Sequence, residues 1–176
     1  GVSRVQELQM VTQKGDNTSV VAIHGNFDDA QTGVKKIFAD KEFGAELADH
    51  GFQFSSANSI NIGRLVPQVV YYVYAYASLL ANEEIKDGEE INVTVPTGNF
   101  GNILAAYFAK QLGVPIKKLI CASNDNKVLY DFFQTGTYDR QRDFILTTSP
   151  SMDILISSNL ERLLYLSTGC DAEQTA

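Results

Sequence analysis

Two glycines three residues apart, Gly98 and Gly101, lie between a run of β-branched residues and an alanine-rich stretch. The run from Ile91 to Val95 alternates as a strand does and meets a proline, and the stretch from Ile103 to Lys110 has helical period. Backbone N–H groups in such a loop and in the following helical turn lack internal partners and lie at the positive end of the helix dipole. The sequence therefore predicts a cradle for a phosphate monoester.

The residues that this loop lacks narrow its ligand. No Lys-Ser or Lys-Thr pair follows the glycines, so the nucleotide P-loop is absent, and Gly-x-x-Gly without a third glycine is a poor dinucleotide fingerprint. A nucleotide is therefore disfavoured. A bare Gly-x-x-Gly more often serves only a strand-to-helix turn and close packing, so the loop alone leaves that interpretation open as well.

A second candidate anion site lies upstream, where small polar residues precede a long apolar stretch. Asn58 and Ser59 belong to the polar part, and Arg64 is the one cation between Phe54 and Tyr72. Polar groups at a helix start can cap the helix or bind an anion, and a guanidinium binds phosphate bidentately at any working pH. Two anion sites suggest a cofactor and a substrate.

With further segments that occur in the same order, these motifs make the chain resemble the threonine synthase family. These are pyridoxal-phosphate enzymes of the tryptophan-synthase-β-like fold, and the resemblance covers essentially all 176 residues. The matching segments are Val5-Gln6-Glu7-Leu8-Gln9-Met10, Gly25-Asn26-Phe27-Asp28-Asp29-Ala30-Gln31, Asn58-Ser59-Ile60-Asn61, the Gly98 to Asn102 loop, Ser149-Pro150-Ser151-Met152-Asp153-Ile154 and Ser158-Asn159-Leu160-Glu161-Arg162-Leu163-Leu164.

The resemblance assigns the two candidate sites to two phosphates. The phosphate of the cofactor pyridoxal phosphate is expected on the glycine loop, at Gly98, Asn99, Phe100, Gly101 and Asn102. The phosphate of the small-molecule substrate O-phosphohomoserine, which the family converts with water to threonine and phosphate, is expected at Asn58, Ser59, Arg64 and Asn102.

The same resemblance implies that part of the catalytic machinery lies elsewhere. The family's Schiff-base lysine lies in a Ser-Phe-Lys-Asp segment upstream of all the residues present here, and the hydroxyl that meets the pyridine nitrogen lies downstream. Lysines such as Lys41 and Lys118 lie in charged or amphipathic surroundings, without the desolvated setting that activates an amine. We therefore expect an internal fragment that contains no catalytic residue and is inactive by itself.

Two other functions stay open. Another pyridoxal-phosphate β/γ-lyase of the same fold would expel a different leaving group, but a neutral leaving group would not need Arg64. The third interpretation is a non-catalytic phosphate-binding or interaction module, which the absence of further coding sequence on either side would favour.

Composition limits the partners. The chain is 44% hydrophobic and 20% charged, as expected of an ordinary globular protein, and its net charge of −7 argues against nucleic acid, whose binding needs clustered Lys and Arg. We expect no membrane partner, because no run of about 18 apolar residues occurs, and no secretory leader at the first four residues. The two cysteines and two histidines lack the spacing of a metal site, and a reduced cytoplasmic setting fits the free thiols.

Strand and helix patterns alternate along the chain. We therefore predict an α/β fold with a mainly parallel sheet and flanking helices, a slice of a fold-type II pyridoxal-phosphate enzyme. Asp28 and Gln31 have capping-box spacing, and Asn159 precedes a last helix that it could cap. Strands are expected at residues 19–24, 91–96 and 118–122, and helices at 28–39, 64–80, from the glycine loop to about 112, 128–133 and 160–166.

The tyrosine-rich helix at 64–80 is predicted to be buried, with its tyrosines in the core or an interface and Pro67 in its first turn or at a kink. The resemblance places a domain boundary near Gln53. Residues 1–53 would be part of the small cofactor-covering domain, and residues 54–176 the central part of the large cofactor-binding domain. Such a slice leaves sheet edges and apolar faces uncovered, so we expect the missing flanking segments of the same protein, or self-association, to cover them.

Overall fold

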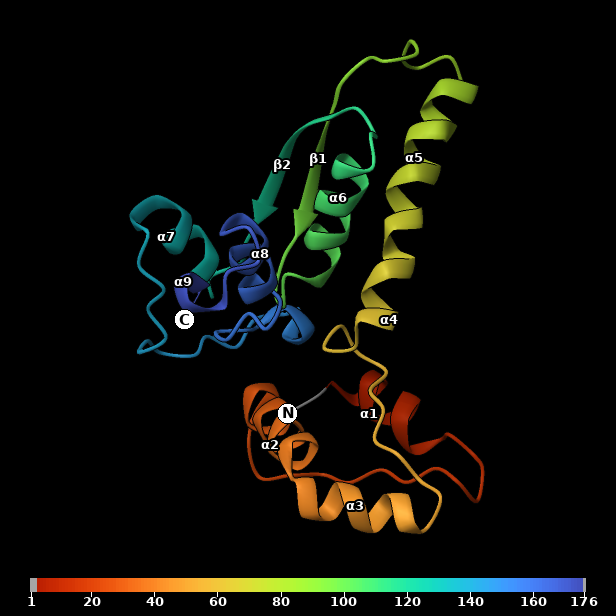
Figure 1. The fold of residues 1–176 in the computed structure, drawn as a ribbon, viewed down its shortest axis with the longest axis vertical. Coiled ribbons are helices and arrows are strands. Elements are labelled where there is room, and N and C mark those ends of the chain that lie inside the picture. Colours follow the sequence, from red (N-terminus) through yellow and green to blue (C-terminus); the bar gives the residue numbers. More distant parts are fainter. Residues whose placement is uncertain (1–2, 176) are drawn as a thin grey trace. The chain divides into compact units, whose positions relative to one another are not determined.

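The computed structural model describes residues 3–175, which divide into two compact units (Figure 1). The first unit contains the chain up to Phe54 together with residues 146–150, and the second contains residues 55–145 and 151–176. No helix within residues 3–175 is both long enough and apolar enough to cross a membrane.

The first unit is helical. Its helices are α1 (Arg4–Val11), α2 (Phe27–Ala39) and α3 (Lys41–Asp49). The rings of Phe38 and Phe43 pack on Phe54 with centroids 5.2 and 5.5 Å away, which holds α2 and α3 against the end of the unit. Aromatic pairs at these separations stabilise beyond their buried area.

Two sequence predictions for the first unit are wrong. The capping box of α2 is formed by Asn26 and Asp29 rather than by Asp28 and Gln31, because Asn26 has the extended backbone that an N-cap needs. The apolar run at 19–24 is not a strand, and its Val20 and Val21 side chains are exposed. A strand needs a partner for its backbone groups, and within residues 3–175 no segment pairs with this run.

The second unit is built on one β-α-β unit. Strands β1 (Ile91–Pro96) and β2 (Ile116–Ala122) pair in parallel, with Val95 beside Cys121, and helix α6 (Gly101–Gln111) connects them. Helix α6 contacts both strands, and helix α5 (Val69–Ala81) packs beside α6 (Figure 1). A crossover helix that packs back onto its two strands is the standard connection of parallel strands.

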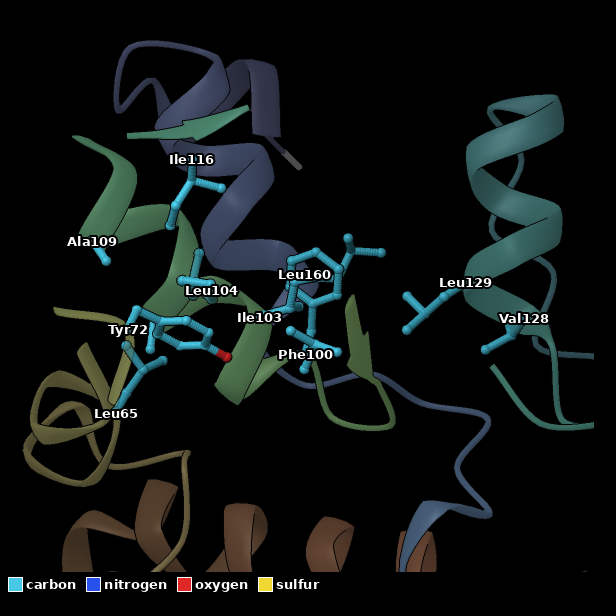
Figure 2. Packing of buried hydrophobic residues seen from close by; sticks show 13 residues of the cluster. Leu65, Tyr72, Phe100, Ile103, Leu104, Ala109, Ile116, Val128, Leu129 and Leu160 are labelled. Atoms are coloured by element: carbon cyan, nitrogen blue, oxygen red, sulfur yellow. The ribbon is translucent and has the colours of Figure 1, made fainter. Parts of the chain in front are cut away.

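Apolar side chains from separate elements of this unit fix the start of α6 in place. Leu65, Leu104 and Ala105 are fully buried, and Phe100 is 5% exposed (Figure 2). Burial of one leucine side chain stabilises a fold by about 1.5–3 kcal/mol. The core thus holds the loop between β1 and α6 against the segment that contains Leu65.

The prediction of one continuous, buried helix at 64–80 is wrong, whereas an interface for its exposed tyrosines stays a prediction. The helix is divided into α4 (Ile62–Leu65), a 3-10 turn η1 (Val66–Gln68) that contains Pro67, and α5. Proline lacks an N–H donor, so it is accommodated in this turn ahead of the longer helix. Tyr72 and Tyr76 are buried, one turn apart, whereas Tyr71 and Tyr74 are 58% and 73% exposed. The expected uncovered apolar surface is therefore present on α5.

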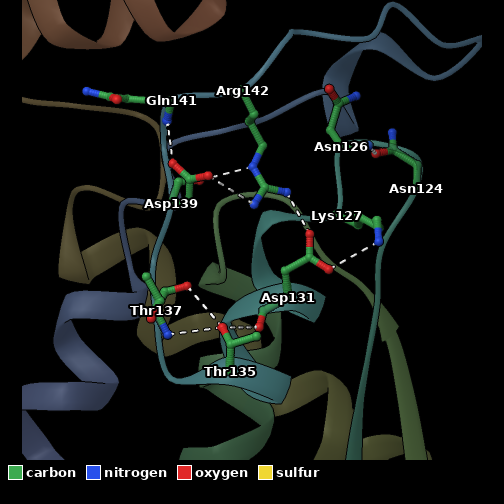
Figure 3. Close-up of polar contacts among 9 residues, drawn as sticks. All are labelled: Asn124, Asn126, Lys127, Asp131, Thr135, Thr137, Asp139, Gln141 and Arg142. Carbon is green, nitrogen blue, oxygen red and sulfur yellow. Dashed lines mark hydrogen bonds and ion pairs between the residues drawn. The ribbon is translucent and has the colours of Figure 1, made fainter.

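The remaining elements of the second unit lie beyond β2. They are α7 (Val128–Thr135), α8 (Leu160–Ser167) and α9 (Ala172–Thr175). The 3-10 turn η2 (Pro150–Met152) begins with the last residue of the first unit and continues into the second. Arg142 ties the segment after α7 to Asp131, which also pairs with Lys127 (Figure 3). The hydrogen bond from Arg142, and then that from Lys127, lower the pKa of the Asp131 carboxyl below its usual 3.8.

Candidate functional site

The loop between β1 and α6 contains an unusual backbone conformation. Phe100 adopts the left-handed conformation, with φ 64° and ψ 4°, immediately before the first residue of α6. Such a conformation costs a residue other than glycine about 1–2 kcal/mol. The Phe100 ring is buried and lies 6.2 Å from the ring of Phe133, and this packing offsets the strain.

Hydrogen bonds from the Ser157–Asn159 segment hold two consecutive carbonyls of this loop. Ser157 Oγ donates to the Gly98 carbonyl at 2.8 Å. The backbone N–H and the Nδ2 of Asn159 both donate to the Asn99 carbonyl, at 3.1 and 2.9 Å. In a trans peptide the N–H points opposite to the carbonyl. The N–H groups of Asn99 and Phe100 therefore point away from the Ser157–Asn159 segment.

These amides are available to a ligand. Within residues 3–175, none of the N–H groups from Gly98 to Asn102 donates a hydrogen bond. They lie at the N-terminus of the 11-residue helix α6, where the helix dipole favours negative charge. A left-handed residue next to a right-handed one also directs successive N–H groups toward the same side, as in anion-binding nests.

The two segments that the sequence singled out separately lie in direct contact. A Cβ atom placed on Gly101 would lie 2.6 Å from Ser59 Oγ and 2.8 Å from Ser59 Cβ. Only glycine permits this approach. The glycine loop and the Asn58–Ser59 segment are thus adjacent, although more than 40 residues of chain, counted from Ser59 to Gly101, separate them.

Arg64 is an exposed cation five residues after Ser59 in the sequence. It lies in the last turn of α4, whose N-cap is Asn61. Its side chain makes no hydrogen bond and no ion pair with any residue that the structure describes. Asn58 closes a local turn, since its Oδ1 accepts from the Ile60 N–H at 3.0 Å. Its Nδ2 donates to no group within the described chain.

Asn102 is more constrained than the sequence suggests. Its Oδ1 accepts from the Tyr72 hydroxyl at 2.5 Å, and its Nδ2 donates to Gln68 Oε1 at 3.1 Å. Gln68 Nε2 donates in turn to the Arg64 carbonyl at 2.8 Å. Burial raises the pKa of the Tyr72 phenol to about 12, so Tyr72 is a donor at neutral pH. One N–H of the Asn102 side-chain amide is left for a ligand, in addition to the backbone N–H.

Several residues that support the site escaped the sequence analysis as site residues. Asn159 precedes α8 as predicted, but its side chain caps no helix and instead binds the Asn99 carbonyl. Arg162 binds the Ser59 and Ile60 carbonyls, and Gln68 and Tyr72 hold Asn102. The one sequence signal for Asn159 and Arg162 was that both lie in a matching segment of the resemblance.

An apolar cavity of about 350 Å³ is lined by Phe100 and by residues of α6, β2, α7 and α8. Ile103, Leu119 and Phe133 are among its lining residues, and Asn58, Ser59 and Arg64 are not. The burial of Cys121 at this cavity raises the pKa of its thiol. With few polar groups in its wall, the cavity does not suit an anion.

Several known proteins are similar in sequence to nearly the whole chain. No protein-family model matches the chain. Threonine synthase-like 1 of Homo sapiens is 50% identical over 175 residues, which are 98% of this chain and 24% of that protein. Threonine synthase of Saccharomyces cerevisiae is 43% identical over 176 residues, 97% of this chain and 33% of that protein. The chain is homologous to the threonine synthases.

Solved structures of threonine synthases support the same relationship. The crystal structure of pyridoxal-phosphate-bound threonine synthase from Brucella melitensis superposes with a TM-score of 0.78 at 47% identity, covering 99% of this chain and 35% of that one. The Escherichia coli threonine synthase gives a TM-score of 0.71 at 33% identity, covering 91% and 36%. The chain thus spans about a quarter to a third of the length of these threonine synthase relatives. The predicted resemblance and the predicted α/β fold with a parallel sheet are confirmed.

Proposed function

We propose that this chain supplies the cofactor-phosphate loop and the substrate-phosphate site of a pyridoxal-phosphate-dependent threonine synthase. The whole protein would convert O-phosphohomoserine and water to threonine and phosphate. The observation that carries this proposal is the contact of Gly101 with Ser59, which joins a loop of unpaired amides to a segment of polar side chains.

The glycine loop fits the phosphate of the cofactor. The donors are the amides of Gly98, Asn99, Phe100, Gly101 and Asn102. The missing Cβ of Gly101 lets Ser59 lie against this loop. When bound, pyridoxal phosphate would supply an electron sink for the loss of phosphate from the substrate. The loop would bind and orient the group, and the buried Phe100 ring would keep the amides in place.

The neighbouring segment fits the phosphate of the substrate. The Arg64 guanidinium, Asn58 Nδ2 and Ser59 Oγ donate no hydrogen bond within the described residues. These groups, with the remaining N–H of Asn102, provide one cation and several neutral donors for a phosphate dianion. A contact that tightens on the departing phosphate would lower the barrier to its loss.

The rest of the whole protein would complete the site. We propose that residues 1–53 are part of the small cofactor-covering domain and residues 54–176 the central part of the large one. Every lysine of this chain is exposed, so covalent attachment of the cofactor is assigned to a lysine elsewhere in the protein, and this stretch alone is proposed to be inactive. We further propose that flanking segments cover the apolar face of α5, and that the protein is cytoplasmic.

The test uses the full-length protein, loaded with pyridoxal phosphate, and measures phosphate and threonine formed from O-phosphohomoserine. Arg64→Ala should leave the cofactor content unchanged. The loss of charge-assisted hydrogen bonds, worth about 1.5–3 kcal/mol each, should lower kcat/KM by at least about tenfold. Arg140→Ala is the matched control, because Arg140 is also exposed and makes no side-chain bond within the described chain.

Two results would contradict the proposal. If Arg64→Ala loses pyridoxal phosphate while the kinetics of cofactor-saturated enzyme survive, the two phosphates have been assigned to the wrong sites. If the unaltered protein prefers a homoserine ester with a neutral leaving group, it belongs to the alternative class of lyases with another leaving group.

A further inference from the structure

Arg162 joins its own segment, which includes Asn159, to the Ser59–Ile60 segment through its guanidinium. Its Nη1 donates to the Ser59 carbonyl at 2.8 Å and to Asn159 Oδ1 at 2.6 Å, and its Nη2 donates to the Ile60 carbonyl. The bonds to Ser59 and Ile60 join residues that are more than 100 positions apart in the sequence. A planar guanidinium fixes the directions of its hydrogen bonds more tightly than an ammonium group does.

The fork on two consecutive carbonyls sets the direction of the peptide between Ser59 and Ile60. Because the Ser59 carbonyl faces Arg162, the Ile60 N–H points the opposite way. That N–H donates to Asn58 Oδ1 at 3.0 Å. Arg162 thereby fixes which way the Asn58 side chain presents its Nδ2.

The bond from Arg162 to Asn159 fixes the direction of a peptide group in the glycine loop in the same way. With its Oδ1 facing Arg162, the Asn159 amide must turn its Nδ2 toward the Asn99 carbonyl, at 2.9 Å. That carbonyl is opposite to the Phe100 N–H, which donates to no group within residues 3–175. One arginine therefore controls a donor on each of the two candidate phosphate sites.

The charge of Arg162 also lacks a counter-ion. Its side chain is half-buried, and within the described residues it forms no ion pair with any carboxylate. All of its acceptors are neutral oxygens, so its positive charge stays uncompensated behind both sites. Charge in a partly desolvated position contributes more to the local potential than charge in water.

We propose that Arg162 is a positioning residue that fixes the spacing and direction of the donors at both phosphate sites without touching either phosphate. The inference rests on the proposed function for the identity of the two phosphates. It adds a residue outside both predicted sites, together with Asn159 as the link to the glycine loop.

The test compares Arg162→Met and Arg162→Lys with the control Arg142→Met in the full-length protein. Arg142 is also a partly buried arginine, but its carboxylate partners are Asp131 and Asp139 (Figure 3), and it bonds to no residue of either candidate phosphate site. Four quantities are measured: the dissociation constant of pyridoxal phosphate from the apoprotein, the dissociation constant of inorganic phosphate by calorimetry, kcat and KM.

Arg162→Met should raise both dissociation constants, and it should raise KM by at least about tenfold. Arg142→Met should change each of these constants by less than about twofold, at a temperature where the two variants are folded. Arg162→Lys retains the charge but not the planar group that bonds to two carbonyls, and it should not restore KM. The inference is overturned if Arg162→Met matches Arg142→Met in all four quantities, or if Arg162→Lys restores them all. If Arg162→Met does not fold, Arg162→Lys alone decides.

Failure of the proposed function is a separate outcome. If the unaltered protein does not turn over O-phosphohomoserine, the kinetic arm is void, but the dissociation constants of pyridoxal phosphate and inorganic phosphate still compare Arg162→Met with its control. An effect on those constants would support the positioning role, and its absence would refute it.

Discussion

The contact of Gly101 with Ser59 can be tested by adding a single methyl group. In Gly101→Ala, the new Cβ would have to move away from Ser59 by about 0.8 Å, from 2.6 Å to the 3.4 Å at which ordinary contact begins. Rotation of the serine side chain moves Oγ but not Ser59 Cβ, which would lie 2.8 Å away. The backbone of one segment must therefore shift.

The magnitude follows from two opposing effects. Overpacking of this kind costs about 1–3 kcal/mol. Replacement of glycine by alanine in a helix gains up to about 1 kcal/mol, and less at the first residue of α6. We expect a net loss of about 1 kcal/mol in the free energy of unfolding, and a fall of at least about tenfold in affinity for pyridoxal phosphate, because the amides move with the helix start.

The assay is chemical denaturation together with cofactor titration of the full-length apoprotein. Gly33→Ala is the control: Gly33 lies within α2, nothing lies within 4 Å of its added Cβ, and the change should stabilise by about 0.5–1 kcal/mol. Ser59→Gly in the Gly101→Ala background removes both clashing atoms and should recover the loss. Wild-type cofactor affinity in Gly101→Ala, with no coupling to Ser59→Gly, would refute the proposed contact.

Three further predictions concern single groups of the second unit. Gly98→Ala should cost less than about 1 kcal/mol in thermal unfolding, because its Cβ would meet only the flexible end of Ile154, at 2.9 Å. The raised pKa of Tyr72 gives stability that is complete below pH 10 and is lost as the pH rises toward 12. Tyr72→Phe should therefore flatten the fall in unfolding free energy over that range. An unchanged dependence of the unfolding free energy on pH would contradict the burial of Tyr72. The lowered pKa of Asp131 gives stability that is present above pH 3.8 and lost as the pH falls through the lowered value. Arg142→Met should move the Asp131 pKa back toward 3.8 in a carbon-13 NMR titration. An unchanged Asp131 pKa would contradict the role of Arg142.

Local patterns in the sequence were sufficient to predict the centre of the second unit. The alternating run at Ile91–Val95, the glycine loop and the alanine-rich helix each follow from preferences of neighbouring residues, and the structure has β1, a loop and α6 at these positions. The unpaired amides at the start of α6 also follow from local geometry, because any helix leaves its first N–H groups without partners.

Local competition and missing partners explain where sequence patterns failed. Asn26 and Asp28 were both suitable caps two residues apart, and the backbone conformation of Asn26 decided between them. The run at 19–24 has the composition of a strand, but strand formation depends on a pairing partner that composition does not reveal. The exposure of Tyr71 and Tyr74 likewise depends on which segments pack against α5.

Only the tertiary structure decided how the site is assembled. Asn159 and the Asn99 carbonyl are 60 residues apart, and Arg162 is 103 residues from Ser59. Hydrogen bonds over such separations carry no periodic signature in a sequence, because they depend on how whole elements pack rather than on the preferences of neighbouring residues. The sequence shows that a glycine stands at 101 and an arginine at 162. Packing decided that Ser59 lies against Gly101 and that Arg162 bonds to the Ser59 carbonyl.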